Sequence, residues 1–182
     1  FAWSEVIPDY AFQRDWSYRH SIKAVTLPVG LKKIGKLAFH NAVDLTTIEL
    51  PASLEFIGEN AFENCTSLNN FIIPNTVETL ELYAFKGCSS LSEIIIPDSV
   101  TAIGNYAFSG CSSLTSIEIP NSVTSIGSWV FADCSSLTSI TISNSVTYDG
   151  FTYTITSIGE AAFCSCSGLT SVTIPNTINS LG

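Results

Sequence analysis

The chain has 182 residues, of which only 13% are charged, and its formal net charge is −9. This length is enough for one domain with a continuous core. An acidic chain repels nucleic-acid phosphates and anionic lipids, because both need a basic surface, so nucleic acid is not an expected partner. No apolar run is long enough to cross a bilayer, and the sequence predicts no membrane span in this chain.

Residues 1–20 do not share the repeat that begins at Ser21, yet they are rich in aromatic residues. Since the end of a repeat array exposes the core of its last unit, we interpret 1–20 as an aromatic-rich, partly helical cap or flanking segment. A ligand site is the alternative. Basic residues also gather near this end. Residues 1–36 hold six basic and three acidic residues (+3), whereas residues 37–182 hold one basic and 13 acidic residues (−12).

Residues 21–182 have a 23-residue repeat. Ala-Phe or Val-Phe pairs recur at this interval, except that the sixth follows after a longer step: Ala38-Phe39, Ala61-Phe62, Ala84-Phe85, Ala107-Phe108, Val130-Phe131 and Ala162-Phe163. A fixed period of this length is typical of a solenoid, in which each coil buries its apolar face against its neighbours. We therefore predict a repeat solenoid of about six to seven coils.

The first half of each repeat alternates apolar and polar residues, as in Leu114-x-x-Ile117-x-Ile119, and this pattern predicts a short strand with one buried face. The proline that follows lacks an N–H and ends the strand. The second half, Val-x-x-Ile-Gly-x-x-Ala-Phe, predicts an irregular or single-turn return arm. We expect the repeat phenylalanines to stack inside the solenoid. We also expect a positive φ at the repeat glycines: Gly35, Gly58, Gly104, Gly127 and Gly159.

Five of the six cysteines lie three residues after a repeat phenylalanine: Cys65, Cys88, Cys111, Cys134 and Cys166. Equivalent positions in adjacent coils predict a ladder of small buried thiols that point the same way. Neighbouring Cα atoms are close enough for disulfides, but an odd-membered ladder cannot pair fully. We predict mostly reduced, buried cysteines. Cys164-Ser165-Cys166 is a weak metal motif, because no further Cys or His ligands lie nearby.

The longer sixth step comes from an insertion near residues 147–155, where Asp149-Gly150 is flanked by residues that favour strands. This pattern predicts a β-hairpin. Its aromatic residues, Tyr148, Phe151 and Tyr153, form a finger that contacts a partner, or the insertion folds back on the solenoid; both interpretations remain open. The sequence ends within a repeat, so we predict no C-terminal cap.

The repeats resemble the BspA-like (Treponema-type) leucine-rich repeats, through the Leu-x-x-Leu-x-Leu-Pro, Ile-Gly-x-x-Ala-Phe and Cys-x-x-Leu patterns that recur from about Ser21 to Gly182. The resemblance implies a right-handed arc with a parallel β-sheet on its concave face. It also implies an extracellular or cell-surface location and a role in adhesion or protein binding.

Nothing in the sequence forms a catalytic or cofactor-binding constellation. The chain has two histidines, His20 and His40, and no paired-carboxylate, phosphate-binding or His-Glu-x-x-His motif. We therefore expect no enzyme activity, no cofactor and no metal site.

The candidate partner-binding residues lie on two surfaces. On the presumed concave sheet, Ile72 and Ile95 occupy outward positions with Glu49 and Glu118 in the flanking coils, a pattern that predicts either a small apolar anchor for a protein or cross-strand pairing alone. On the return arm, one position holds aromatic residues in three successive coils: Tyr83, Tyr106 and Trp129. This stripe stacks on sugar or on a partner chain, or it covers the Ala-Phe core from outside.

The favoured hypothesis is a non-catalytic, cell-surface or secreted module that binds a protein, such as a host or matrix component. A carbohydrate-binding surface protein that uses the aromatic stripe is the first alternative. A structural spacer within a larger surface protein is the second.

Overall fold

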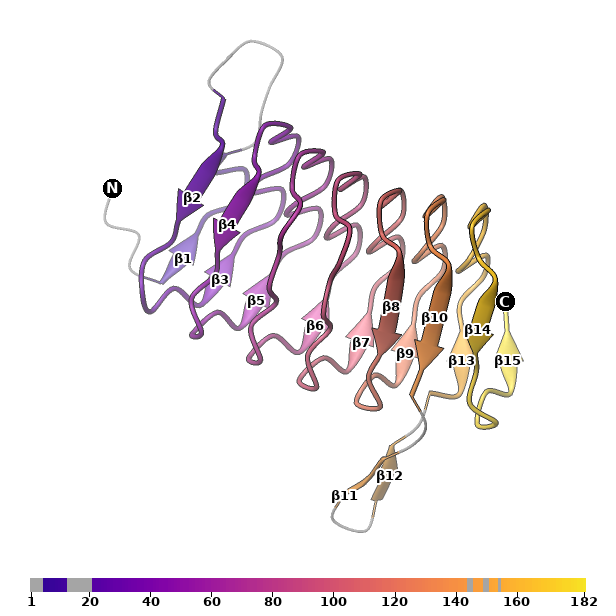
Figure 1. Ribbon diagram of the computed structural model, residues 1–182. Coiled ribbons are helices and arrows are strands. Elements are labelled where there is room, and N and C mark those ends of the chain that lie inside the picture. The colour runs from indigo at the N-terminus through magenta and orange to yellow at the C-terminus, as the bar shows by residue number, and fades with distance from the viewer. Residues whose placement is uncertain (1–4, 13–20, 144–145, 149–150, 154) are drawn as a thin grey trace.

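The protein is a row of stacked coils with β1 at one end and β15 at the other (Figure 1). The computed structural model describes residues 5–12, 21–143, 146–148, 151–153 and 155–182. Strands of successive coils pair in parallel, as where Ile103 lies opposite Ile126. Each coil follows the sequence repeat, which confirms the predicted repeat solenoid.

The second half of the repeat builds the longest sheet, here called the long sheet. Within the described residues it has eight two-residue strands, in the order β1-β3-β5-β6-β7-β9-β13-β15. Turns follow these strands, and the described residues contain no helix, so the return arm is a short strand followed by turns and not the irregular or single-turn arm predicted. The strands are Val6–Ile7, Lys33–Ile34, Phe56–Ile57, Thr79–Leu80, Ala102–Ile103, Ser125–Ile126, Ser157–Ile158 and Ser180–Leu181.

The first half of the repeat forms the opposite side of each coil, here called the front row. It contains β2 paired with β4, and separately β8, β10 and β14 paired in order. Isolated bridges, Thr47 to Asn70 and Ile72 to Ile95, lie between these two sheets. The front-row strands are Ala24–Thr26, Thr47–Glu49, Ser116–Ile119, Ser139–Ile142 and Ser171–Thr173.

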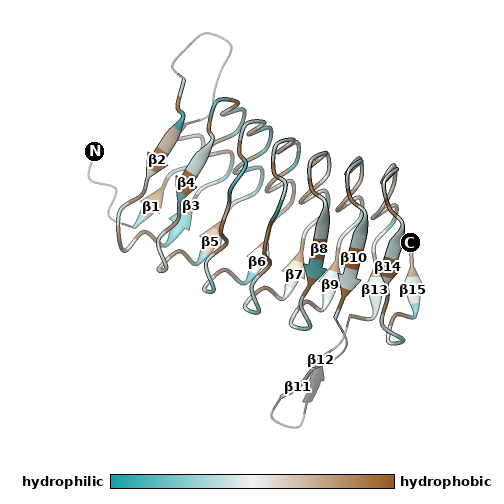
Figure 2. Cartoon of the chain, in the orientation of Figure 1, coloured by the Kyte–Doolittle hydropathy of each residue, from teal (hydrophilic) through white to brown (hydrophobic). Residues whose placement is uncertain are grey.

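The core between the two sides is a continuous column of apolar side chains, and the coils alternate hydrophobic and hydrophilic segments around it (Figure 2). The predicted phenylalanine ladder is confirmed. Phe108 stacks between Phe85 and Phe131, with ring centroids 5.6 and 5.7 Å away. Its side chain is fully buried, so each ring contributes apolar area to two coil interfaces at once.

The repeat glycines allow close approach of neighbouring backbones, and the predicted positive φ at these positions is wrong. A Cβ placed on Gly104 would lie 2.8 Å from the amide nitrogen of Leu82 and 2.9 Å from the carbonyl carbon of Glu81. The left-handed conformation falls two residues later instead, where side chains are present: Tyr10, Leu37, Asn60, Tyr83, Tyr106, Trp129 and Ala161.

Residues 5–12, within the segment predicted to be a cap, form the second half of a further coil. Ile7 pairs with Ile34 in the long sheet, and the amide of Phe12 donates to the carbonyl of Ala38. The Phe12 ring stacks on Phe39 at 4.9 Å and extends the phenylalanine ladder by one member. The rest of the predicted cap, 1–4 and 13–20, lies outside the described residues.

Candidate functional site

The strands of the front row bury alternate residues and expose the others to solvent. Ile73 and Ile96 point into the core and are 3% and 5% exposed, respectively. Ile72 and Ile95 precede them directly, so they point outward and are 81% and 71% exposed. Equivalent positions in other coils hold threonine or glutamate. The front row therefore places two large aliphatic side chains in water, in adjacent coils joined by a β-bridge.

Acidic side chains border the two isoleucines. Glu49 and Glu118 are exposed at the same strand position in the flanking coils, as the sequence predicted. Sequence analysis missed Glu93, which lies two residues before Ile95 and on the same exposed face. It also missed Asp98, exposed at the turn that follows. The alternation of the strand could have identified Glu93, because residues two apart share a face.

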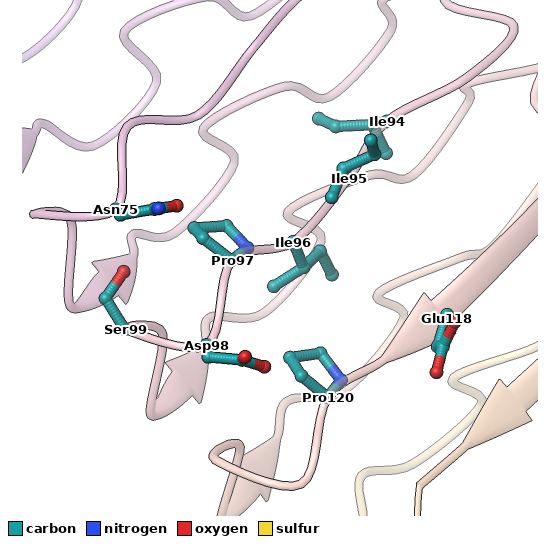
Figure 3. Close-up of a pocket in the computed structure, with 9 residues that line it drawn as sticks. All are labelled: Asn75, Ile94, Ile95, Ile96, Pro97, Asp98, Ser99, Glu118 and Pro120. Carbon is teal, nitrogen blue, oxygen red and sulfur yellow. The ribbon is translucent and has the colours of Figure 1, made fainter. Parts of the chain in front are cut away.

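The front row is open beside Ile95. The next coil contributes β8, the first strand of the separate sheet formed by β8, β10 and β14. In the described residues the Ile95 coil has no front-row strand, only the bridge from Ile95 to Ile72. A hollow lies at this break, and its lining includes Ile95, Asp98, Glu118 and Pro120. Figure 3 shows these four residues on the two neighbouring coils. The hollow joins the apolar and acidic parts of the surface.

The aromatic stripe forms a stack along the solenoid axis. Tyr83 and Tyr106 lie 4.9 Å apart between ring centroids, and Tyr106 and Trp129 lie 6.1 Å apart at an interplanar angle of 8°. Lys86 adds a cation–π contact to Tyr83 at 4.9 Å. All three rings are half-buried. Because Tyr106 stacks between two rings, both of its faces are already occupied.

The insertion forms the predicted antiparallel hairpin, in which β11 (Val146–Tyr148) pairs with β12 (Phe151–Tyr153). Tyr148 lies opposite Phe151 in the register, and Val146 lies opposite Tyr153. Figure 1 shows the two strands extending away from the coils. The backbone of β11 and β12 thus protrudes from the solenoid, and contact of this hairpin with a partner stays a prediction.

The equivalent cysteines form the predicted internal ladder. All six lie in the described residues as free thiols, and Cys65, Cys88, Cys111 and Cys134 are buried. Each ladder thiol donates to the carbonyl of a phenylalanine in the preceding coil, as where Cys88 Sγ lies 3.2 Å from the oxygen of Phe62. Burial raises the pKa of Cys65 and Cys134 to about 12, and it raises the pKa of Cys88 and Cys111 well above the usual range.

Thiol reagents should therefore distinguish the cysteines. In the native protein at pH 8 we expect Ellman's reagent to modify the exposed Cys164 first and the half-buried Cys166 more slowly, because the thiolate is the reacting species. The four buried ladder thiols should react only after denaturation. Thiol counting before and after urea, with mass spectrometry to locate the sites, checks this. Labelling of Cys88 or Cys111 in the folded protein would contradict the ladder.

The described residues contain no group of three or more His, Cys, Asp or Glu side chains placed to hold a metal ion. His40 is half-buried, and its Nε2 atom lies 3.5 Å from Glu63 Oε2. Glu63 also accepts hydrogen bonds from Asn60 and Lys86. Because His40, Glu63 and Lys86 belong to successive coils, this cluster joins neighbouring coils to one another.

Comparison with known proteins identifies the repeats. The family model of the BspA-type leucine-rich repeat region matches residues 5–95 and 150–182, in six copies. The chain belongs to the BspA-type leucine-rich repeat family. The match begins at residue 5, in agreement with the half-coil that the structure places at 5–12, ahead of the start at Ser21 expected from the sequence.

Solved structures of bacterial leucine-rich repeat proteins share the fold of this BspA-type chain. The leucine-rich repeat protein of T. pallidum is 30% identical, with a TM-score of 0.80 over 97% of this chain and 77% of that chain. A leucine-rich repeat protein of Bacteroides ovatus is 25% identical, with a TM-score of 0.75 over 98% of this chain and 54% of that one. The pneumococcal vaccine antigen PcpA is 31% identical, with a TM-score of 0.61 over 72% of this chain and 32% of that one.

A search of the curated proteins gave no match to this BspA-type chain. In the part of the chain that the structure describes, we find no helix with the length and apolar character needed to cross a membrane.

Proposed function

We propose that this BspA-type chain is a non-catalytic, protein-binding module of a secreted or cell-surface protein. One observation carries the proposal: Ile72 and Ile95 are 81% and 71% exposed in adjacent coils, whereas the isoleucines that follow them directly, Ile73 and Ile96, are buried. Exposed aliphatic side chains that lie side by side and are bordered by polar residues are typical of a contact surface for a protein. The binding surface would comprise these two residues with Glu49, Glu93, Asp98 and Glu118.

The location at the cell surface or outside the cell draws support from the relatives. PcpA, at 31% identity, is described as a pneumococcal vaccine antigen. We extend this location to the present chain by analogy. Host or matrix proteins are then the natural candidates for the partner.

Carbohydrate binding through the aromatic stripe receives less support from the geometry. Sugars stack on the open face of an aromatic ring, but the faces of Tyr106 are covered by Tyr83 and Trp129. The stripe also follows the coil interface, where stacking of neighbouring rings stabilises the array. We therefore assign the stripe a structural role and place the binding function on the front row.

Capture from extracellular-matrix and cell-surface extracts tests the proposed function. We expect the double variant Ile72→Asp/Ile95→Asp to lose specific capture by at least ~10-fold, because the apolar anchor of the interface is removed. The matched control is Thr26→Asp/Thr141→Asp, which places the same charges at the same exposed strand position in other coils. Equal capture by wild type and the isoleucine variant, with both folded, would contradict binding at this surface.

A further inference from the structure

All charged residues of the front row beyond the first coil are acidic. Glu49, Glu93, Asp98 and Glu118 occur in front-row segments that contain no lysine, arginine or histidine: 46–52, 69–75, 92–98, 115–121, 138–144 and 170–176. All four side chains are exposed. Among the described residues no ion pair joins any of them to a basic side chain.

Two acidic residues on the other side of the coils pair with lysines. Lys32 lies 3.5 Å from Glu55, Lys36 lies 2.6 Å from Glu59, and the repeat places each lysine beside its glutamate in the next coil. The hydrogen bond that Lys36 donates to Glu59 raises the pKa of Lys36. These lysines offset the charge of Glu55 and Glu59, whereas in the described residues no basic side chain offsets the charge of the four front-row acids.

The unpaired acids lie around the exposed isoleucines. Glu49, Ile72, Ile95 and Glu118 occupy one strand position in four successive coils. At the usual spacing of about 4.8 Å between parallel strands, this row is about 14 Å long. Asp98 and Glu118 also line the hollow next to Ile95 (Figure 3). A single short segment of a partner could therefore contact both isoleucines and the acids at both ends.

This charge pattern disfavours a second copy of the chain as the occupant. A symmetric dimer centred on Ile72 and Ile95 would place the same acidic rim on both sides of the interface. Like charges brought together at an interface repel each other and oppose association. The partner should instead carry positive charge where this surface carries negative charge.

We propose that the front row recognises a cationic, aliphatic protein segment, with branched aliphatic side chains packed on Ile72 and Ile95 and lysine or arginine side chains at the acids on either side. The inference rests on the proposed function and specifies the chemistry of its partner. Interfacial charge complementarity raises the association rate and rejects wrong partners, so the acids supply selectivity and the isoleucines supply the anchor.

An array of synthetic 12-residue peptides tests this proposal. The peptides vary independently in net charge and in the number of Val, Ile and Leu residues. We expect bound peptides to combine both features, and we expect Glu49→Gln/Glu93→Gln/Glu118→Gln to weaken their binding ~10-fold at low salt. The matched control is Glu78→Gln/Asp133→Asn/Glu160→Gln, which removes three exposed acids away from the front row and should bind as wild type does.

The outcomes separate the inference from the function on which it rests. Peptide binding lost in Ile72→Asp/Ile95→Asp but unchanged in the glutamine triple variant would leave the binding surface in place and overturn the cationic partner. Binding of neutral or acidic aliphatic peptides, no bound peptide, or concentration-dependent dimerisation through Ile72 and Ile95 in sedimentation experiments would also overturn it. Peptide binding unaffected by the isoleucine substitutions would overturn the proposed function itself.

Discussion

Replacing Phe108 with alanine should lower the free energy of unfolding by about 3–5 kcal/mol. The ring is fully buried and stacks on both neighbours of the ladder, so its removal leaves a cavity at two coil interfaces. In a solenoid each coil is stabilised by its neighbours. A defect in a middle coil therefore weakens the interface through which the two halves of the array stabilise each other. Urea denaturation followed by circular dichroism measures the loss, and we also expect the transition to broaden or split.

Phe163→Ala provides the control for this prediction. Phe163 is half-buried, and among the described residues its ring stacks on Phe131 alone, at 6.0 Å, so its truncation should cost less than half as much as the loss of Phe108. A wild-type denaturation midpoint for Phe108→Ala would contradict the stabilising role that we assign to the phenylalanine ladder. Equal losses of unfolding free energy for the two variants would show that stacking on two neighbouring rings stabilises the protein no more than stacking on one.

Replacing Gly104 with alanine should destabilise the protein by about 3 kcal/mol, although the change adds only one methyl group. The new Cβ would lie within 2.9 Å of backbone atoms of the preceding coil, and backbone atoms cannot rotate away as a side chain can. The two coils must separate locally, which strains the parallel pairing of β6 with β7. Thermal and urea denaturation of the purified variant measure the cost.

Glu81→Ala is the matched control, because Glu81 occupies the equivalent slot one coil earlier and already carries a Cβ. This substitution should change the free energy of unfolding by less than about 1 kcal/mol. If Gly104→Ala were as mild as Glu81→Ala, the coils would be able to separate without cost, and the close approach would not explain the repeat glycines.

The phenylalanine and cysteine ladders were predictable, because identical residues that recur at one fixed interval occupy equivalent positions in successive coils. Phe39 through Phe131 and Cys65 through Cys134 keep a constant interval, and the structure stacks them as expected. The half-coil at residues 5–12 escaped this argument for a simple reason. The step from Phe12 to Phe39 is longer than the next steps of the ladder, and Pro8 stands where most later coils have glycine. The surviving signal is Ile7-x-x-x-Ala11-Phe12, which matches Ile34-x-x-x-Ala38-Phe39.

The long sheet and the role of the glycines were not predictable from the same pattern. A strand of two residues, such as Ala102–Ile103, is too short to show alternation, so periodicity cannot reveal it. Glycine is selected both for positive φ and for close approach of backbones, and one sequence cannot separate these causes. The left-handed residue is Tyr106 in one coil and Ala161 in another, because the neighbouring coils fix the backbone.

The candidate surface was predictable in part. Strand alternation identified Ile72, Ile95, Glu49 and Glu118 as outward residues, and the structure exposes all four. Whether an acid has a basic neighbour depends on which residues the coils bring together in space. The contrast between Glu55, paired with Lys32, and the unpaired Glu93 therefore required coordinates.

The hairpin shows how this scaffold can acquire new surface without a change in its interior. The step from Phe131 to Phe163 is longer than the others in the ladder, yet Ile158 pairs with Ile126 and the amide of Phe131 donates to Ala162 as in an ordinary coil. Because loop-closure entropy grows slowly with length, this junction can host segments of quite different size and sequence. It is a natural point for loop exchange during divergence, and for grafting foreign peptides onto a rigid support.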